Sequence, residues 1–320
     1  MTVLITGGTG FIGTEVARIL LNKGEKRPVV FDINPSINRL DDIKDQVEVV
    51  KGDLGNYSHV LDVVKKKTPN VIYHLGGMLS VPSEADPTAA LRANALGTLH
   101  VLEAARLFNV SQVLFSSTIA TYGLDIRDEV INDYTLQRPQ LFYGATKVFG
   151  EHMGLFYKRK HGLDFRTIRY PSVVGPGVKS PGVVQFTSWV IEECAKGNPF
   201  IITLKAETKV PVIYFKDAAQ AIVRLGEAPI ENIKTVNYVI TGANPIASAG
   251  ELADIVRANL SGAEISFQPD LELQGVLDQL LLPLDDSNAQ KEWGWCSEYD
   301  QVRIVEDFLQ ELNLNPQRYV

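Results

Sequence analysis

The chain has 320 residues, of which 45% are hydrophobic and 22% are charged, and these proportions exclude collagen-like, coiled-coil and disordered proteins. Its 31 basic and 38 acidic side chains give a formal net charge of −7. Because nucleic acids bind to basic surfaces, this balance argues against a nucleic-acid partner.

The cysteines, the histidines and the hydropathy bear on the cellular compartment, on metal binding and on membrane association. Cys194 and Cys296 are isolated thiols with no framework for disulfides, which favours a reducing compartment, and we expect a cytoplasmic protein. The five histidines show no metal-ligand spacing, so we predict no metal site. No apolar run approaches the roughly 18 to 20 residues of a membrane span, so we expect no membrane partner.

Short apolar runs alternate with helix-period segments through the first half of the chain. Such runs are typical of parallel strands that are covered on both faces. Right-handed crossovers between them favour an α/β fold with a doubly wound parallel sheet. The predicted strands are residues 3–6, 28–31, 47–51, 71–75, 112–116 and 165–169, and the main helices are 13–22, 88–108 and 143–161.

Glycine and proline interrupt this alternation after Pro171. Residues 210–215 and 236–240 are still typical of strands, and we expect both at the far side of the same sheet. Beyond them the chain is predicted to be mostly helical, with a short strand at 264–267. We expect one domain of residues 1–170 plus about 210–242, and a smaller, discontinuous C-terminal substrate lobe of residues 171–209 and 243–320.

A glycine trio lies between the first predicted strand and the first predicted helix. Gly7, Gly10 and Gly13 are spaced as GxxGxxG, and they let the backbone turn sharply and approach a diphosphate at the helix N-terminus. Asp32 ends the second predicted strand, where a carboxylate accepts hydrogen bonds from an adenosine ribose. The combination predicts a dinucleotide site, and NAD is favoured over NADP because Asp32 would repel a 2′-phosphate.

Two residues near this site leave alternatives open. Arg39 lies in the loop after Asp32 and could swing toward the ribose, where it would accommodate a 2′-phosphate. Asp53 follows the third predicted strand, where it could contact the adenine amino group or instead cap the next helix.

Tyr143 and Lys147 are four residues apart, so they share one face of the predicted helix. A lysine beside a tyrosine favours the phenolate and lowers its pKa, which makes the phenol a usable general acid or base near neutral pH. Three hydroxyl residues, Ser116, Ser117 and Thr118, follow the fifth predicted strand, where open α/β sheets place their ligands.

Together, the motifs TGGTGFIG, GDL, HLGG, FSSTIATYG, YGATK and RYPSVVGPG resemble the extended short-chain dehydrogenase/reductase family, which includes the NAD-dependent epimerases and dehydratases. The resemblance implies an NAD-binding Rossmann domain and hydride transfer to or from nicotinamide. It implies that Tyr143 moves a proton and that Lys147 tunes Tyr143 and holds the ribose. Thr118, with Ser117 as the alternative, would hydrogen-bond the reacting oxygen.

The family pattern also implies the contacts of cofactor, substrate and partner subunit. Helices 88–108 and 143–161 carry apolar residues on more than one face, which fits the four-helix homodimer contact common in this family. Substrate contacts are implied for Ser80, Thr118 and Tyr143. The implied NAD contacts are Gly7, Gly10, Phe11, Ile12, Gly13, Asp32, Asp53, Leu54, Leu75, Gly76, Gly77, Ser116, Tyr143, Lys147, Tyr170 and Pro171.

Within the family, Arg138-Pro139, YGATKVFGE and residues 284–287 are similar to the short-chain L-threonine 3-dehydrogenase group. We predict an NAD-dependent oxidoreductase acting on a secondary alcohol or ketone of a small substrate, with an L-threonine-like 3-hydroxy acid as the first candidate. Residues 181–186 lack the hydroxyls of that group, and 280–282 are leucines. These departures predict a more apolar pocket, unless the leucines belong to the core.

Two other functions stay open. A nucleotide-sugar epimerase or dehydratase would retain its NAD, but the arginine that clamps a diphosphate in such enzymes is missing before Asp285. A non-catalytic NAD-sensing regulator would keep the fold without the chemistry, although a sensor has no need of a tuned phenol at Tyr143.

Overall fold

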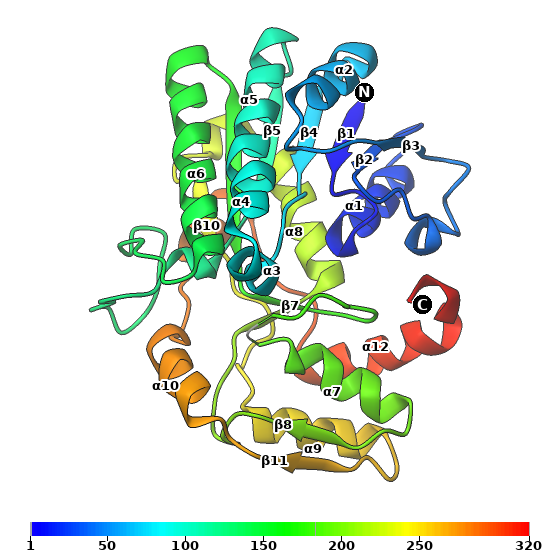
Figure 1. The fold of residues 1–320 in the computed structure, drawn as a ribbon, viewed down its shortest axis with the longest axis vertical. Helices are drawn as coiled ribbons and strands as arrows, with labels where there is room; N and C mark the ends of the chain where they lie inside the picture. Colours follow the sequence, from blue (N-terminus) through cyan, green and yellow to red (C-terminus); the bar gives the residue numbers. More distant parts are fainter. Residues whose placement is uncertain (1, 183, 320) are drawn as a thin grey trace.

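The computed structural model describes residues 2–182 and 184–319, and its centre is a parallel sheet. Within these residues the sheet has seven strands in the order β3-β2-β1-β4-β5-β6-β10, and all neighbours pair in parallel. This order confirms the predicted doubly wound α/β fold. The strands are β1 (Val3–Thr6), β2 (Val29–Asp32), β3 (Glu48–Lys51), β4 (Val71–His74), β5 (Gln112–Thr118), β6 (Asp164–Tyr170) and β10 (Asn237–Val239) (Figure 1).

Helices cover both faces of the sheet, which explains why its strands are so apolar. On one face α1 and α8 pack together, and Val16 and Ala218 belong to the core they share with the strands. On the other face α2, α5 and α6 lie side by side, and Val64 and Leu102 fill a second core. These helices are α1 (Phe11–Asn22), α2 (Tyr57–Lys67), α5 (Gly97–Leu107), α6 (Phe142–His161) and α8 (Phe215–Glu227).

The helix predicted over residues 88–108 forms with a π-helical turn in its middle. This turn, η2 (Leu91–Leu96), joins α4 (Pro87–Ala90) to α5, and α3 (Ser80–Ala85) precedes them. Asn94 in the turn is buried; its Oδ1 accepts from the Met78 amide at 2.7 Å and its Nδ2 donates to the Met78 carbonyl at 3.1 Å. These bonds tie the loop after β4 to the helix, and π-helical turns often occur at functional sites.

A second lobe with its own apolar core follows β6 and β10. Val174, Val190, Leu252 and Ile304 belong to this core. α11 (Ser287–Trp293) returns from the lobe to pack near β10. The other elements are β7 (Ser172–Val174), β8 (Phe200–Ile202), β9 (Val212–Tyr214), β11 (Ile265–Phe267), α7 (Phe186–Ala195), α9 (Ala249–Asn259), α10 (Leu271–Leu280) and α12 (Gln301–Leu314).

One predicted strand is in a different place. The sequence puts residues 210–215 in the central sheet, but β9 pairs with β7 in a separate two-stranded sheet. The edge beside β6 is taken by β10, which pairs with it from Asn237 opposite Thr167. β7 and β8, each of three residues, were not predicted.

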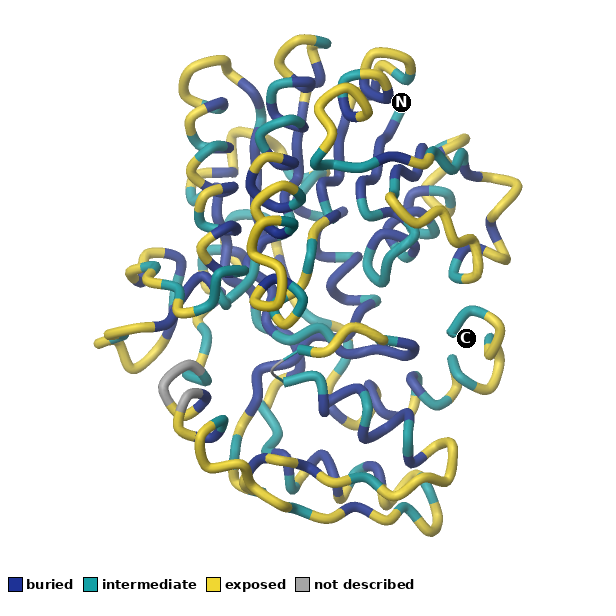
Figure 2. Tube along the Cα trace, in the orientation of Figure 1, coloured by how far each residue is buried: buried dark blue, intermediate teal, exposed yellow. Residues whose placement is uncertain are grey.

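The central strands and the inner sides of the helices are buried, whereas exposed residues follow the outer helix faces and the loops (Figure 2). The C-terminal end of the chain, after α12, lies opposite the loop that follows β2 (Figure 1). Of the helices that the structure describes, none combines the length and the hydropathy that a bilayer crossing requires.

Candidate active site

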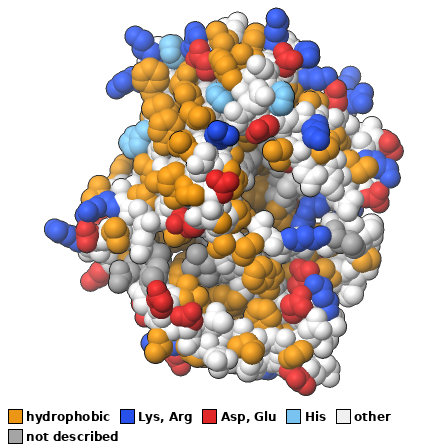
Figure 3. All heavy atoms as spheres, in the orientation of Figure 1, with side chains coloured by type: hydrophobic (Ala, Val, Ile, Leu, Met, Phe, Trp, Pro, Cys, Tyr) orange, Lys and Arg blue, Asp and Glu red, His pale blue; other side chains and the backbone are white. Residues whose placement is uncertain are grey.

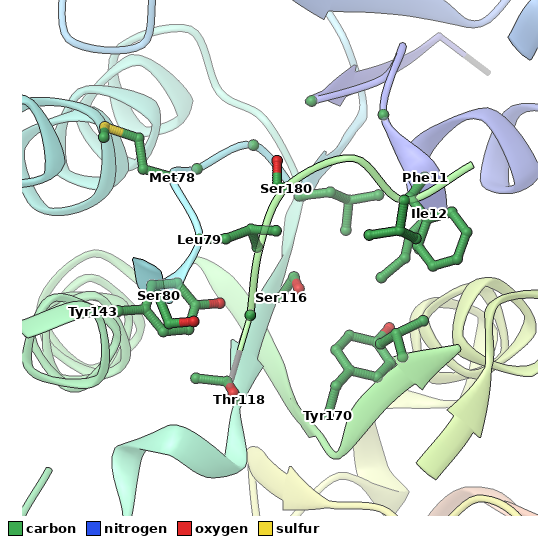
Figure 4. Close-up of a pocket in the computed structure, with 18 of the residues that line it drawn as sticks. Phe11, Ile12, Met78, Leu79, Ser80, Ser116, Thr118, Tyr143, Tyr170 and Ser180 are labelled. Carbon is green, nitrogen blue, oxygen red and sulfur yellow. The ribbon is translucent and has the colours of Figure 1, made fainter. Parts of the chain in front are cut away.

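A cavity of about 1170 Å³ lies between the two lobes, at the carboxyl ends of the central strands. Its walls include every residue that the family pattern assigns to NAD or to substrate. Phe11 and Ile12 face it from one side, and Tyr143 and Ser80 lie on the opposite side (Figure 4). The structure thus brings the predicted site residues together, and their individual roles stay predictions.

Close packing of the backbone explains the glycines of the loop, and the open helix N-terminus behind them fits a diphosphate. Gly7 has φ of +66°, and a Cβ there would lie 2.6 Å from the Cα of Gly76. A Cβ on Gly13 would lie 2.6 Å from the Cα of Gly8. Gly10 caps α1 without a side-chain bond, so the first-turn amides of the helix are open to an anion.

Asp32 and Asp53 both line the cavity after their strands. The Asp32 carboxylate accepts from the amides of Thr9 (3.3 Å) and Asn34 (3.1 Å), which fixes it at the end of β2. Asp53 Oδ1 accepts from the Gly55 amide at 2.8 Å. Asn56 caps α2, so the alternative interpretation of Asp53 as the helix cap is wrong.

Tyr143 and Lys147 lie one turn apart at the start of α6. The Lys147 ammonium donates to the Ser116 carbonyl (Nζ–O 2.8 Å) and lies 4.8 Å from the centroid of the Phe115 ring. Its Nζ is 5.7 Å from the centroid of the Tyr143 ring. A Cβ on Gly77 would lie 2.9 Å from Asn94 Oδ1, so a side chain there would disturb Asn94.

Burial shifts the pKa of both groups. Desolvation raises the pKa of Tyr143 to about 12 and lowers the pKa of Lys147 to about 8. We predicted that Lys147 lowers the pKa of the tyrosine, and the structure contradicts this. The ammonium points to the Ser116 carbonyl, so burial dominates at the phenol.

The hydroxyls at the end of β5 alternate between two sides of the strand. Thr118 lines the cavity, and its Oγ1 accepts from the Ala120 amide at 3.1 Å, which leaves the hydroxyl hydrogen to donate. The Ser117 hydroxyl is buried and donates to Glu151 Oε1 at 2.5 Å. Ser117 and Thr118 both border the cavity, the Ser117 hydroxyl is bonded to Glu151, and the choice of Thr118 as the hydroxyl that reaches a substrate stays a prediction.

A buried ion pair connects β6 to α6 next to the end of β5. Arg169 on β6 and Glu151 on α6 are 4% and 1% exposed, with Nη2 and Oε2 2.6 Å apart. The guanidinium also donates to the Tyr122 hydroxyl at 2.7 Å, and Glu151 accepts from Gln137 at 3.0 Å. Through Ser117 the pair connects the end of β5 to the helix that carries Tyr143.

His74 is buried beneath the cavity, and both of its ring nitrogens have hydrogen-bond partners. Its Nδ1 lies 2.7 Å from Thr6 Oγ1 and its Nε2 lies 2.9 Å from Thr98 Oγ1. Burial and the nearby charge of Lys147 lower the pKa of the ring to about 3. The neutral imidazole thus links β1, β4 and α5 beneath the cavity.

The residues expected to make the pocket apolar divide between cavity and core. Val184 and Leu281 line the cavity, whereas Leu282 packs into a small core that includes Val239 of β10. Val183 and the side chain of Leu280 lie outside the described residues.

The motifs did not identify several cavity residues. Gln185, which precedes α7, lines the cavity beside Gly182, and its Nε2 is buried without a partner in the described structure. Leu277, Arg318 and Tyr319 also line the cavity. These side chains come from segments far apart in the chain with no fixed spacing, so no sequence pattern marks them.

A family model described as NAD dependent epimerase/dehydratase matches residues 3–241. The chain belongs to this family. With Tyr143 and Lys147 on one cavity wall and dehydrogenases among its relatives, it is an enzyme of the extended short-chain dehydrogenase/reductase type.

Several known proteins are similar to this chain over most of its length. Mitochondrial L-threonine 3-dehydrogenase from Bos taurus is 29% identical over 315 residues, covering 96% of this chain and 81% of that protein. D-erythronate dehydrogenase from Cupriavidus necator is 31% identical over 262 residues, covering 76% and 79%. The holo structure of a GalE-like L-threonine dehydrogenase from Cupriavidus necator superposes with a TM-score of 0.88 at 27% identity, covering 98% and 100%.

Proposed function

We propose that the protein is an NAD-dependent dehydrogenase that oxidises a secondary alcohol of a small substrate, with L-threonine or a related 3-hydroxy acid as the first candidate. One observation carries the proposal: Tyr143, Lys147 and Thr118 share a single cavity with the glycine loop and Asp32. The relatives named for L-threonine and D-erythronate support the choice of a small hydroxy acid.

NAD fits the first part of the cavity. The glycine loop and the first turn of α1 would hold its diphosphate, and Asp32 would accept from the adenosine ribose. Asp53 and Leu54 would border the adenine, and Lys147 would hold the second ribose. When bound there, NAD supplies the hydride acceptor at its nicotinamide ring.

The protein residues would handle the proton. Thr118 would hold the alcohol oxygen through its hydroxyl, and Tyr143 would take the proton as general base. Because the pKa of Tyr143 is about 12 and that of Lys147 about 8, the pair holds both protons at neutral pH. The lysine loses its proton first, and its neutral amine would then accept the phenolic proton as Tyr143 takes the proton of the alcohol, which leaves Lys147 as the ammonium and Tyr143 as the phenol.

The far wall of the cavity would select the substrate. A Cβ on Gly182 would lie 4.0 Å from Ser80 Oγ and 3.4 Å from Gln185 Oε1, so these residues border the end of the cavity near Tyr143. Val184 and Leu281 make the rest of that wall apolar. Ser80 and the unpaired Gln185 amide would bind a carboxylate, and the apolar wall would limit the size of its chain.

The enzyme is tested by incubating the purified protein with NAD and L-threonine and following absorbance at 340 nm. Tyr143→Phe should keep NAD binding and lower the rate by about two to four orders of magnitude. If no alcohol or ketone in a broad panel is turned over while NAD binds, the protein is a sensor. If NAD co-purifies and UDP-sugars bind tightly, it is an epimerase.

We also propose that the enzyme is a cytoplasmic homodimer that associates through helices 88–108 and 143–161. Hydrophobic side chains gather over α5 and α6 (Figure 3), and the exposed ones include Leu91, Leu96, Leu107, Phe149 and Phe156. Sedimentation velocity should give twice the mass of the chain, and Phe149→Glu with Phe156→Glu should give the single chain. A monomeric wild type would contradict the dimer.

A further inference from the structure

Arg39 reaches from the loop after β2 across the cavity to the second lobe. Its guanidinium carbon lies 5.4 Å from the centroids of both the Phe11 and the Tyr319 ring. Its Nη2 donates to the carbonyls of Pro176 at 3.2 Å and Gly177 at 2.5 Å. The two aromatic rings and the two carbonyls, from both lobes, thus hold a cationic group on the cavity wall.

This cation has no acidic partner. Within the described residues Arg39 forms no ion pair, and its bonds go to neutral carbonyls. Glu192 is the acid that influences it, but Glu192 accepts from the Gly177 amide at 2.8 Å and pairs with Lys196 at 2.9 Å. Desolvation lowers the pKa of Arg39, because burial disfavours the charged guanidinium.

A second arginine, Arg318, directly precedes Tyr319 in the chain. Arg318 also lines the cavity, and its Nη2 lies 2.9 Å from Asp42. Arg18 shares the same carboxylate at 3.0 Å, so one Asp42 serves two guanidiniums. Arg318 Nη1 is 3.9 Å from Glu311, and its Nε is buried with no partner in the described structure.

The cavity is therefore basic although the protein is acidic. Five lysines and arginines and three aspartates line it within the described residues, whereas the whole chain has 31 basic and 38 acidic side chains. Figure 3 shows basic side chains at the edge of the hollow between the lobes. A cavity of this charge favours an anionic ligand.

We propose that Arg39 and Arg318 form an anion subsite for the diphosphate of NAD, with Tyr319 holding the Arg39 guanidinium in place. Arg39 lies over the ring of Phe11, the first residue of α1, so its charge adds to that of the helix N-terminus. Because Nη2 of Arg39 donates to the two carbonyls, its Nε and Nη1 would donate to the diphosphate, a planar pair of donors that a lysine lacks. The inference rests on the proposed NAD binding.

The subsite makes the C-terminal end part of the cofactor site. Tyr319 is 280 positions after Arg39, and its hydroxyl donates to Glu311 of α12 at 2.9 Å. Arg318 is likewise fixed from the loop after β2 through Asp42. A diphosphate bound between the glycine loop and these side chains would hold the two lobes together.

The test is titration calorimetry of the full chain with adenosine, ADP, 2′-AMP and NAD. Arg39→Met should weaken ADP and NAD by about 10-fold to 100-fold, the loss of a charge-assisted hydrogen bond, and should change adenosine by less than about twofold. The salt dependence of ADP binding should also fall. Arg39→Lys should recover part of the loss, and Tyr319→Leu should weaken ADP by about 2-fold to 5-fold.

Arg27→Met is the matched control, because Arg27 is exposed and does not line the cavity. The subsite is wrong if Arg39→Met behaves like this control while the wild type binds NAD. It is also wrong if adenosine and ADP weaken equally, which would show a purely structural role, or if 2′-AMP weakens and ADP does not. A wild type that binds neither NAD nor ADP would overturn the proposed function as well.

Discussion

Glu151→Gln should destabilise the protein strongly although it changes a single atom. Glu151 is 1% exposed, and its carboxylate accepts from Arg169 Nε at 3.0 Å and Nη2 at 2.6 Å, and from Ser117 Oγ at 2.5 Å. The substitution removes the only counter-charge within bonding distance of a guanidinium that is 4% exposed, among the described residues. Losing one partner of a buried pair costs about 3 to 5 kcal/mol of unfolding free energy.

Urea denaturation measures this loss, and Asp62→Asn is the matched control. Asp62 and Lys66 form an ion pair 3.1 Å apart on α2 and are 66% and 69% exposed, so solvent screens the charges. We expect the control to change the unfolding free energy far less than Glu151→Gln. Similar values for the two variants would refute the conclusion that the buried pair holds β5 against α6.

Three further predictions concern the cofactor site and the pH dependence. Asp32→Ala should weaken NAD by about 1 to 3 kcal/mol in calorimetry, and unchanged affinity would remove Asp32 from the ribose site. Gly13→Ala should abolish measurable NAD binding because its Cβ would lie 2.6 Å from Gly8 Cα, whereas Gly275→Ala in α10, with nothing within 4 Å, should leave NAD binding intact. The rate of alcohol oxidation should rise about tenfold per pH unit up to a pKa near 8, because the Tyr143–Lys147 pair must release a proton before it can accept one. Lys147→Met should move that rise to higher pH, and an unchanged profile would exclude the lysine.

The features of the site that depend on spacing within one element could be predicted from the sequence. The glycine loop, Asp32 and the Tyr143–Lys147 pair each depend on spacing within one strand, turn or helix. The preference for Thr118 over Ser117 came from the family resemblance, whereas the bond between Ser117 and Glu151 needed the structure, because Glu151 comes from another element.

The parts that failed depend on long-range contacts. The pairing of β9 was placed wrongly because three residues fit either sheet, and only the position of β10 decides between them. The pKa of Tyr143 was expected in the wrong direction because spacing reports the distance to Lys147 and not the burial of the phenol. Arg39 and Tyr319 meet through tertiary structure alone.

The chain passes from the central sheet to the second lobe, back to the sheet and again to the second lobe. This order limits how chimeras of such enzymes can be built. The last strand of the central sheet, β10, and the helix α8 that covers it come after the first excursion into the second lobe. A fragment ending at residue 170 would leave the edge of β6 unpaired and only α1 on one face of the sheet, so we expect it to aggregate. Chimeras that exchange substrate preference between relatives must therefore exchange two separate segments, 171–209 and 243–320. A chimera with a single crossover point would not contain both segments from one parent and the whole sheet from the other.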